Sequence, residues 1–249
     1  MKGIILAGGS GQRLHPLTRI TNKHLLPVYD RPMIYFAIEQ LASAGIDRIM
    51  IVTGGNHAGE FLQLLGNGSA FGLRHLDYAY QERAGGIAEA LGLTEWFAAG
   101  DPIAVLLGDN IFQYSISGIV DRFNAAPHGA RIVLAEVDNP SAYGVADLQD
   151  GRIRAIIEKP KDPPSRYAVT GLYLYDARVY GMLDTLVPSA RGELEITDIN
   201  NRYLALGALT HEHVQGYWAD CGESADMLLR AGQLVAANGA NRPLPAASR

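Results

Sequence analysis

Short apolar runs alternate with amphipathic segments up to about residue 115. Apolar runs of this length are typical of strands that are buried on both faces, whereas apolar residues at helical spacing predict helices. The expected strands lie at residues 2–7, 49–52, 73–80 and 103–107. The expected helices lie at residues 31–42, 59–65 and 86–97, the first with Asp30 as its candidate N-cap.

Strand patterns predominate after residue 117. We expect strands at residues 131–137, 145–149, 153–158, 168–175 and 209–214, and helices at 117–126, 176–187, 195–206 and 224–237. The tail over 238–249 has no periodicity and is expected to be loose. The alternation in the first half predicts an α/β fold in which helices cover both faces of a mostly parallel sheet, with ligands beyond the carboxyl ends of its strands.

Composition excludes several classes of protein. The 249 residues are 48% hydrophobic and 19% charged, as in ordinary globular proteins, and no apolar run approaches a membrane span. The first strand follows Met1 directly, so we expect no leader peptide. Cys221 is the only cysteine, which excludes an internal disulfide and favours a cytoplasmic setting. A net charge of −5 argues against a general binder of nucleic acid or anionic membranes.

The first expected strand leads into a glycine-rich loop. Glycine lets backbone N–H groups approach an anion closely, and Arg13 and Lys23 follow with cationic side chains. This order predicts a triphosphate site. The loop is not a P-loop, because no Lys-Ser or Lys-Thr follows, and Leu14 stands where a dinucleotide fingerprint has its third glycine. The alternative is a glycine-rich corner without a ligand.

Two aspartates are candidate metal ligands. Asp109 follows an apolar strand directly, next to Asn110, and Asp220 precedes the last expected helix. Carboxylates, waters and substrate phosphates are the ligands that Mg²⁺ prefers. Either aspartate alone is equally typical of a turn or a helix cap, and spacing does not establish that the two meet.

Further polar residues lie at the ends of other strands. Glu158 and Lys159 would suit a sugar phosphate, the glutamate accepting hydroxyl protons and the lysine neutralising the phosphate, although a solvated charged turn is the alternative. Tyr143-Gly144 is either the entry to a strand or a place where the backbone approaches a sugar. Gln81 could read the edge of a base through its amide, with Gly86 letting the base lie against the backbone.

Taken together, these stretches resemble the glucose-1-phosphate thymidylyltransferases. The resemblance runs in order from residue 1 to about residue 237, and its motifs lie at residues 6–14, 22–28, 86–91, 107–111, 158–160, 170–173, 191–198 and 218–220. It implies a three-layer αβα nucleotidyltransferase fold of the Rossmann-like type, with a mixed sheet and a β-rich elaboration that binds the sugar. It also implies a single domain over 1–237, in which 1–115 mainly binds nucleotide and 116–222 mainly binds the sugar phosphate.

The resemblance further implies the reaction dTTP + α-D-glucose 1-phosphate → dTDP-glucose + pyrophosphate, by direct in-line attack with Mg²⁺. Arg13 and Lys23 would be catalytic, on the leaving pyrophosphate and the α-phosphate, and Asp109 and Asp220 would hold the metal. The implied nucleotide-binding residues are Leu6, Ala7, Gly8, Gly9, Ser10, Gly11, Gln81, Gly86 and Asn110. The implied sugar-phosphate-binding residues are Tyr143, Gly144, Glu158, Lys159, Val169 and Thr170.

The sequence departs from the family pattern at three places: the segment expected to contact the base, the residue next to Asp220, and the C-terminal end. Residues 84–88 read Ala-Gly-Gly-Ile-Ala where many members have Pro-Asp-Gly-Leu-Ala, which leaves base selectivity open, and Cys221 replaces a common threonine. The sequence ends before the C-terminal helices of longer members, so feedback inhibition by dTDP-rhamnose and their tetramer are not carried over, although we expect a homo-oligomer.

Two other functions remain open at this point. One is a sister enzyme that uses UTP or another hexose 1-phosphate, and the other is a nucleotide-sugar sensor without catalysis. A sensor would ordinarily have lost Arg13, Lys23 or Asp109, and all three are present.

Overall fold

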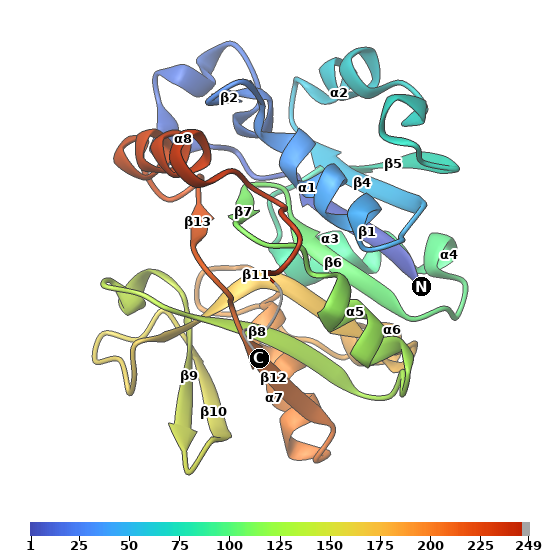
Figure 1. The fold of residues 1–249 in the computed structure, drawn as a ribbon. Helices are drawn as coiled ribbons and strands as arrows, with labels where there is room; N and C mark the ends of the chain where they lie inside the picture. The colour runs from blue at the N-terminus through green and yellow to red at the C-terminus, as the bar shows by residue number, and fades with distance from the viewer. Residues whose placement is uncertain (246–249) are drawn as a thin grey trace.

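The computed structural model describes residues 1–245, so the last four residues of the expected tail lie outside the described part. Within these residues, nine strands form one mixed sheet with helices on both faces (Figure 1). The main order is β10-β9-β11-β6-β1-β4-β5, and β8 pairs with both β11 and β12. The expected α/β class is confirmed.

Four strands from the first half of the chain are parallel to one another, with β1 between β4 and β6. They are β1 (Lys2–Ala7), β4 (Arg48–Gly54), β5 (His75–Gln81) and β6 (Ile103–Leu107). The second half joins β6 through the antiparallel β11, and its β9–β10 hairpin extends away from the parallel strands (Figure 1). Its strands are β8 (Ala130–Glu136), β9 (Gly144–Gln149), β10 (Arg152–Glu158), β11 (Tyr167–Tyr175) and β12 (Leu209–His213).

Alternation along β1 divides the core into two layers. Ile4 and Leu6 pack with one set of helices, and Ile5 and Ala7 with the other, because successive side chains of a strand point to opposite faces. Burying an isoleucine of this kind stabilises the fold by about 1.5–3 kcal/mol. The first set is α3 (Ile87–Gly92), α4 (Glu95–Ala98), α6 (Arg178–Leu183) and α7 (Ile196–Ala205). The second set is α1 (Met33–Ser43), α2 (Ala58–Leu65) and α5 (Ser117–Asn124).

Several short elements were not predicted. Two pairs of short strands are antiparallel, β2 (Pro27–Val28) with β3 (Arg31–Pro32) and β7 (Asn110–Phe112) with β13 (Trp218–Asp220). Runs of two or three residues are too short to show a hydrophobic period. Single 3₁₀ turns lie at Gln12–Leu14, Leu17–Arg19, Lys23–Leu25, Ser69–Phe71 and Pro140–Ala142.

Two helix predictions were wrong in detail. Asp30 does not cap α1, since the N-cap is Pro32 and the Asp30 carboxylate accepts from Arg31 Nε at 2.9 Å instead. The single helix expected at 86–97 is broken into α3 and α4. The buried Thr94 lies at the break and donates from its hydroxyl to the Leu91 carbonyl at 2.7 Å, which competes with helical pairing.

The last helix, α8 (Ala225–Asn238), begins where expected, with Ser224 accepting from the Met227 backbone. The chain beyond it is not loose throughout, because two of its residues pair with the last residue of β7 and with the residue that follows it. Asn241 N donates to Phe112 O at 3.0 Å and Arg242 N donates to Gln113 O at 2.9 Å. Residues 241–242 are therefore held against the body of the protein.

Candidate active site

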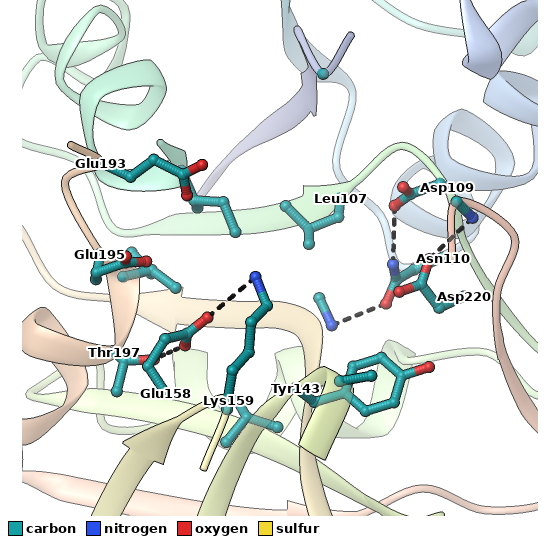
Figure 2. A pocket seen from close by; sticks show the side chains of 18 of the residues that line it. Leu107, Asp109, Asn110, Tyr143, Glu158, Lys159, Glu193, Glu195, Thr197 and Asp220 are labelled. Carbon is teal, nitrogen blue, oxygen red and sulfur yellow. Dashed lines mark hydrogen bonds and ion pairs between the residues drawn. The ribbon is translucent and has the colours of Figure 1, made fainter. Parts of the chain in front are cut away.

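A cavity of about 450 Å³ opens beyond the carboxyl ends of β1 and β6, where the alternating pattern predicted a ligand site (Figure 2). A neighbouring cavity of about 310 Å³ shares Gly9, Lys23 and Asp109 with it. The predicted site residues that line the larger cavity are Gly9, Ser10, Gly11, Arg13, Lys23, Asp109, Asn110, Tyr143, Gly144, Glu158, Lys159, Val169 and Asp220. Those that line only the smaller one are Leu6, Gly8, Gln81 and Gly86. The fold thus brings together residues from both halves of the chain.

Ala7 and Thr170 line neither cavity. Both are fully buried, and the Thr170 hydroxyl donates to the Val133 carbonyl at 3.0 Å. Each follows a residue that does line a cavity, Leu6 and Val169 respectively, and the next residue of a strand points to the other face. The structure therefore places these two residues behind the lining.

The glycine loop needs its glycines for close packing. A Cβ at Gly8 would lie 2.7 Å from Gln81 Oε1, and a Cβ at Gly11 would lie 3.1 Å from Lys23 Cβ. Gly11 also has φ +64, a left-handed conformation that glycine adopts without strain. The loop thus passes directly over Gln81 and Lys23, while the Arg13 side chain is exposed and borders both cavities.

Lys23 and Asp109 form a largely buried ion pair, with Nζ 2.5 Å from Oδ2. Burial alone would lower the pKa of Lys23, but the charge and hydrogen bond of Asp109 raise it above its ordinary value. Burial likewise opposes ionisation of Asp109, whereas Lys23 and a hydrogen bond from Asn110 Nδ2 hold its pKa well below the usual range. The pair therefore keeps a positive and a negative charge at the floor of the cavity.

Asp220 reaches the same place through the pairing of β13 with β7. The register sets Asp220 opposite Asn110, and Cys221 N donates to Asp109 O at 2.9 Å. Burial and the nearby Asp109 charge raise the pKa of Asp220 to about 7. Asp109 and Asp220 lie on the same side of the cavity, next to Asn110 (Figure 2), and Lys23 lines the same cavity.

The donor set fits a magnesium ion. The space above Gly222 is bordered by Asp109 Oδ2 and by Lys23 Nζ, so that a Cβ there would lie 2.7 Å from the ammonium nitrogen. Because the Asp109 charge raises the proton affinity of Asp220, a cation shared by the two carboxylates would be favourable, and Mg²⁺ takes one or two carboxylates together with substrate phosphates and water. Within residues 1–245 no group of three or more His, Cys, Asp or Glu side chains could hold a metal, so further ligands would come from substrate and water.

His24 lines the smaller cavity beside Lys23 and is buried. Its ring nitrogen Nδ1 lies 2.7 Å from the Asn22 side-chain oxygen. Burial, with the Lys23 charge, lowers the pKa of His24 to about 3, so the ring is neutral in the folded protein at neutral pH.

This burial predicts an acid-dependent loss of stability. Between pH 6.5 and about 3 the unfolded chain protonates His24 and the folded chain does not, so the free energy of unfolding falls as pH falls. Replacing His24 with glutamine (H24Q) should make this fall shallower by about 1 kcal/mol per pH unit over that range. Urea denaturation at pH 6.5 and pH 4.5 measures the difference. The exposed His128→Gln should leave the slope unchanged, and an unchanged slope in H24Q would contradict this account.

The opposite wall of the cavity carries Glu158 and Lys159 (Figure 2). Glu158 Oε1 lies 3.5 Å from Lys159 Nζ, and its other oxygen accepts from the Thr197 hydroxyl at 2.6 Å. Lys159 has φ +43, a conformation that costs a non-glycine residue about 1–3 kcal/mol, and its backbone N–H donates to Tyr143 O at 2.9 Å. The strained backbone presents the ammonium group to the cavity.

Sequence reasoning assigned no roles to several residues of this wall. Arg191 lies 3.3 Å from Glu158 and 2.8 Å from Glu195, and Glu195 also accepts from Ser189 at 2.7 Å. The Arg191 to Asp198 stretch contributed to the family resemblance, and its single arginine followed by Glu193 and Glu195 at alternate positions was the available signal. Its contact with Glu158 needed the loop before α7 to fold across the cavity.

Gln81 and Gly86 form the end of the smaller cavity. Gln81 Nε2 donates to Gly86 O at 3.3 Å and to Glu89 Oε1 at 3.2 Å. Gly86 has φ +103, and a Cβ there would lie 2.4 Å from the Leu194 backbone oxygen. Gly86 therefore lets the start of α3 lie against the loop before α7.

Gly86→Ala should destabilise the fold by about 1–3 kcal/mol, because the new methyl group meets backbone that cannot rotate away and φ becomes strained. The matched control is Gly92→Ala at the end of α3, where no atom outside the chain neighbours and the helix's own backbone lies within 4 Å of the added Cβ and alanine favours the helix. Urea denaturation of both variants measures the difference. Equal stability of the two variants would contradict this role for Gly86.

The glycine loop, the Lys23–Asp109 pair and the half-buried Asp220 lie opposite a wall that carries Glu158 and Lys159. This arrangement places cations at two positions for phosphate groups and leaves room for two ligands that meet at the cavity floor. Fold and site together are those of a nucleotidyltransferase.

Comparisons with known proteins agree with this class. The nucleotidyl transferase family model matches residues 2–237. A glucose-1-phosphate thymidylyltransferase of Actinoplanes sp. is 47% identical over 232 residues, which cover 92% of this chain and 76% of the relative. A Bacillus anthracis crystal structure, described as a candidate glucose-1-phosphate thymidylyltransferase in complex with sucrose, is 52% identical with a TM-score of 0.90, and 94% of each chain is covered. A UDP-glucose pyrophosphorylase in complex with UDP-glucose shares the fold, with a TM-score of 0.81 at 24% identity over 95% of this chain and 98% of the other.

The chain belongs to the nucleotidyl transferase family and, within it, to the glucose-1-phosphate thymidylyltransferases. Enzymes of this family generally use a divalent metal ion. Over residues 1–245, none of the helices combines the length and the apolar character that crossing a membrane requires.

Proposed function

We propose that this chain transfers a thymidylyl group from dTTP to α-D-glucose 1-phosphate and releases pyrophosphate. The Lys23–Asp109 pair carries the proposal, because it lies between the glycine loop and the wall formed by Glu158 and Lys159. A cation at that junction would face the phosphorus atom at which nucleotide and sugar phosphate react. The activity by which the relatives are named supports the choice of substrates.

The nucleotide would lie along the glycine loop. Backbone N–H groups from Gly8 to Gly11 would bind its phosphates, Arg13 would stabilise the charge that develops on the leaving pyrophosphate, and Lys23 that on the α-phosphate. Gln81 and Gly86, at the end of the smaller cavity, would contact the base. The work of the protein is then positioning and charge neutralisation.

The sugar phosphate would lie against the opposite wall. Lys159 would neutralise its phosphate, and Glu158 would accept hydrogen bonds from hydroxyl groups of the hexose. Tyr143, Gly144 and Val169 would shape the pocket. The phosphate oxygen would attack the α-phosphorus in line, forming the new P–O bond as the bond to pyrophosphate breaks.

Asp109 and Asp220 would hold Mg²⁺ at the cavity floor. When bound, the ion would neutralise phosphate oxygens of the nucleotide. Lys23 keeps its own charge through Asp109 and so acts on the same phosphate from the protein side.

Isotope exchange tests the direct attack. Labelled pyrophosphate should enter dTTP when glucose 1-phosphate and Mg²⁺ are present, and should not enter dTTP without the sugar phosphate. Exchange without sugar would indicate a covalent thymidylyl-enzyme and contradict the in-line step. Absence of exchange in the complete mixture would contradict the substrate pair.

A further inference from the structure

A third cavity, of about 600 Å³, lies behind the wall of the site just described. It is bordered by the end of β8, by β12 and by α8, and it shares Tyr143, Trp218 and Asp220 with the 450 Å³ cavity. Residues that line both spaces lie between them. Because Asp220 is at the floor, the two aromatic rings form the partition.

The two rings are held very differently. Trp218 belongs to β13, and its indole N–H donates to Asn110 Oδ1 at 2.7 Å, an oxygen that also accepts from Gly171 N at 2.8 Å. Tyr143 precedes β9 in a loop, and its ring meets the edge of Trp218 at 5.3 Å between centroids. Among the described residues, the Tyr143 hydroxyl donates to one acceptor, Glu223 Oε2 at 2.5 Å. Trp218 is therefore fixed by the sheet, whereas Tyr143 is fixed at its outer end by one carboxylate.

We propose that the Tyr143–Glu223 hydrogen bond is a latch that limits the size of the sugar 1-phosphate this site accepts. With the latch closed, the ring of Tyr143 separates the hexose cavity from the space behind it. With the latch removed, the ring is free to turn, and a substituent on the sugar can enter the 600 Å³ cavity. This inference rests on the proposed function and adds a positioning residue, Glu223, that does not line the hexose cavity itself.

The charged residues that line the 600 Å³ cavity indicate which sugar substituent it would accept. It is lined by four carboxylates (Glu136, Asp138, Asp220 and Glu223) and by one arginine, Arg230, and Arg166 forms ion pairs with Glu136 and Asp138, so the carboxylates outnumber the cations. Carboxylates repel an anionic group but accept hydrogen bonds from an amide N–H or a hydroxyl. The sugar admitted by an open latch is therefore a neutral, substituted hexose 1-phosphate, for which N-acetylglucosamine 1-phosphate is a suitable probe.

Selectivity between two sugars gives the first test. For each variant, kcat/KM with N-acetylglucosamine 1-phosphate is divided by that with glucose 1-phosphate, both with dTTP and Mg²⁺, so that effects on metal or nucleotide cancel. Tyr143→Phe and Glu223→Ala should each raise this ratio by about tenfold, the effect of losing one hydrogen bond to a carboxylate. Glu223→Gln keeps an acceptor and should retain the wild-type ratio.

The double variant decides whether the two residues act as one unit. Tyr143→Phe combined with Glu223→Ala should raise the ratio no further than either change alone, because the bond is already broken. An unchanged ratio in both single variants, additive effects in the double variant, or a Glu223→Gln ratio equal to that of Glu223→Ala would each overturn the latch.

A second measurement tests the latch without relying on turnover. Trp96 and Trp218 are the only tryptophans, so Trp96→Phe leaves Trp218 as the single reporter, in contact with Tyr143. In that background, Glu223→Ala and Tyr143→Phe should increase acrylamide quenching of Trp218, and Glu223→Gln should not. Unchanged quenching would overturn the proposal. Should the wild-type protein fail to release pyrophosphate, the proposed function falls while this quenching result still decides the latch.

Discussion

Replacing Lys23 with alanine should lower kcat for pyrophosphate release by about 10²–10³-fold. The Lys23 ammonium keeps its charge through Asp109 and lies at the junction of the two ligand cavities, where negative charge develops on the reacting phosphate. The loss should appear in kcat more than in the KM for dTTP, because the contact is strongest in the transition state. Steady-state kinetics with dTTP and glucose 1-phosphate measures it.

Lys23→Ala also leaves the buried Asp109 carboxylate without its charged partner, which by itself lowers stability. Lys23→Gln separates the two effects, since it can still donate to Asp109 but carries no charge. We expect Lys23→Gln to be as inactive as Lys23→Ala while its urea midpoint stays closer to that of the wild type. Lys161→Ala, an exposed lysine of the turn after β10, should behave as the wild type. Near-normal turnover by Lys23→Gln would contradict the role given to this residue.

Asp220→Ala should raise the Mg²⁺ concentration required for half-maximal rate by at least about tenfold. The raised pKa of Asp220 reflects burial beside Asp109, and removing one of two carboxylates leaves a bound cation with fewer oxygen ligands. A Mg²⁺ titration of the initial rate at saturating substrates measures this requirement.

The control for this variant is Asp226→Ala, which removes an exposed aspartate from the first turn of α8. Its Mg²⁺ requirement should match that of the wild type. If Asp220 has only a structural role, Asp220→Ala should lower the melting temperature, because the hydrogen bond from Gly222 N is lost, and should leave the Mg²⁺ requirement unchanged. An unchanged Mg²⁺ requirement in Asp220→Ala would therefore reduce this residue to a structural role.

The sequence predicted those parts of the site that are determined by residues close together in the chain. β1 is a wholly apolar run that ends in glycines, so both the buried strand and the loop beyond it followed from six residues and their neighbours. Asp109 was found in the same way, because it directly follows the apolar β6. In each case the cause of the structure lies within about ten residues of the site.

The rest of the site depends on contacts between distant segments. Asp220 meets Asp109 only through the pairing of β7 with β13, which are three residues each and lack any detectable period. Thr170 was assigned to the site with Val169, although strand alternation turns it into the core. No local pattern around Glu223 indicates a role, because its distinguishing feature is a hydrogen bond to Tyr143, which lies 80 residues away in the sequence.

One measurement tests the central claim most directly: pyrophosphate release from the purified protein with glucose 1-phosphate and Mg²⁺, run in parallel with dTTP, UTP, CTP, GTP and ATP. We expect clear preference for dTTP, read through the small cavity that Gln81 and Gly86 close. Turnover of UTP at least equal to that of dTTP would keep the in-line chemistry but assign the chain to a sister activity, as residues 84–88 allow. No release with any of the five nucleotides would contradict the proposed function.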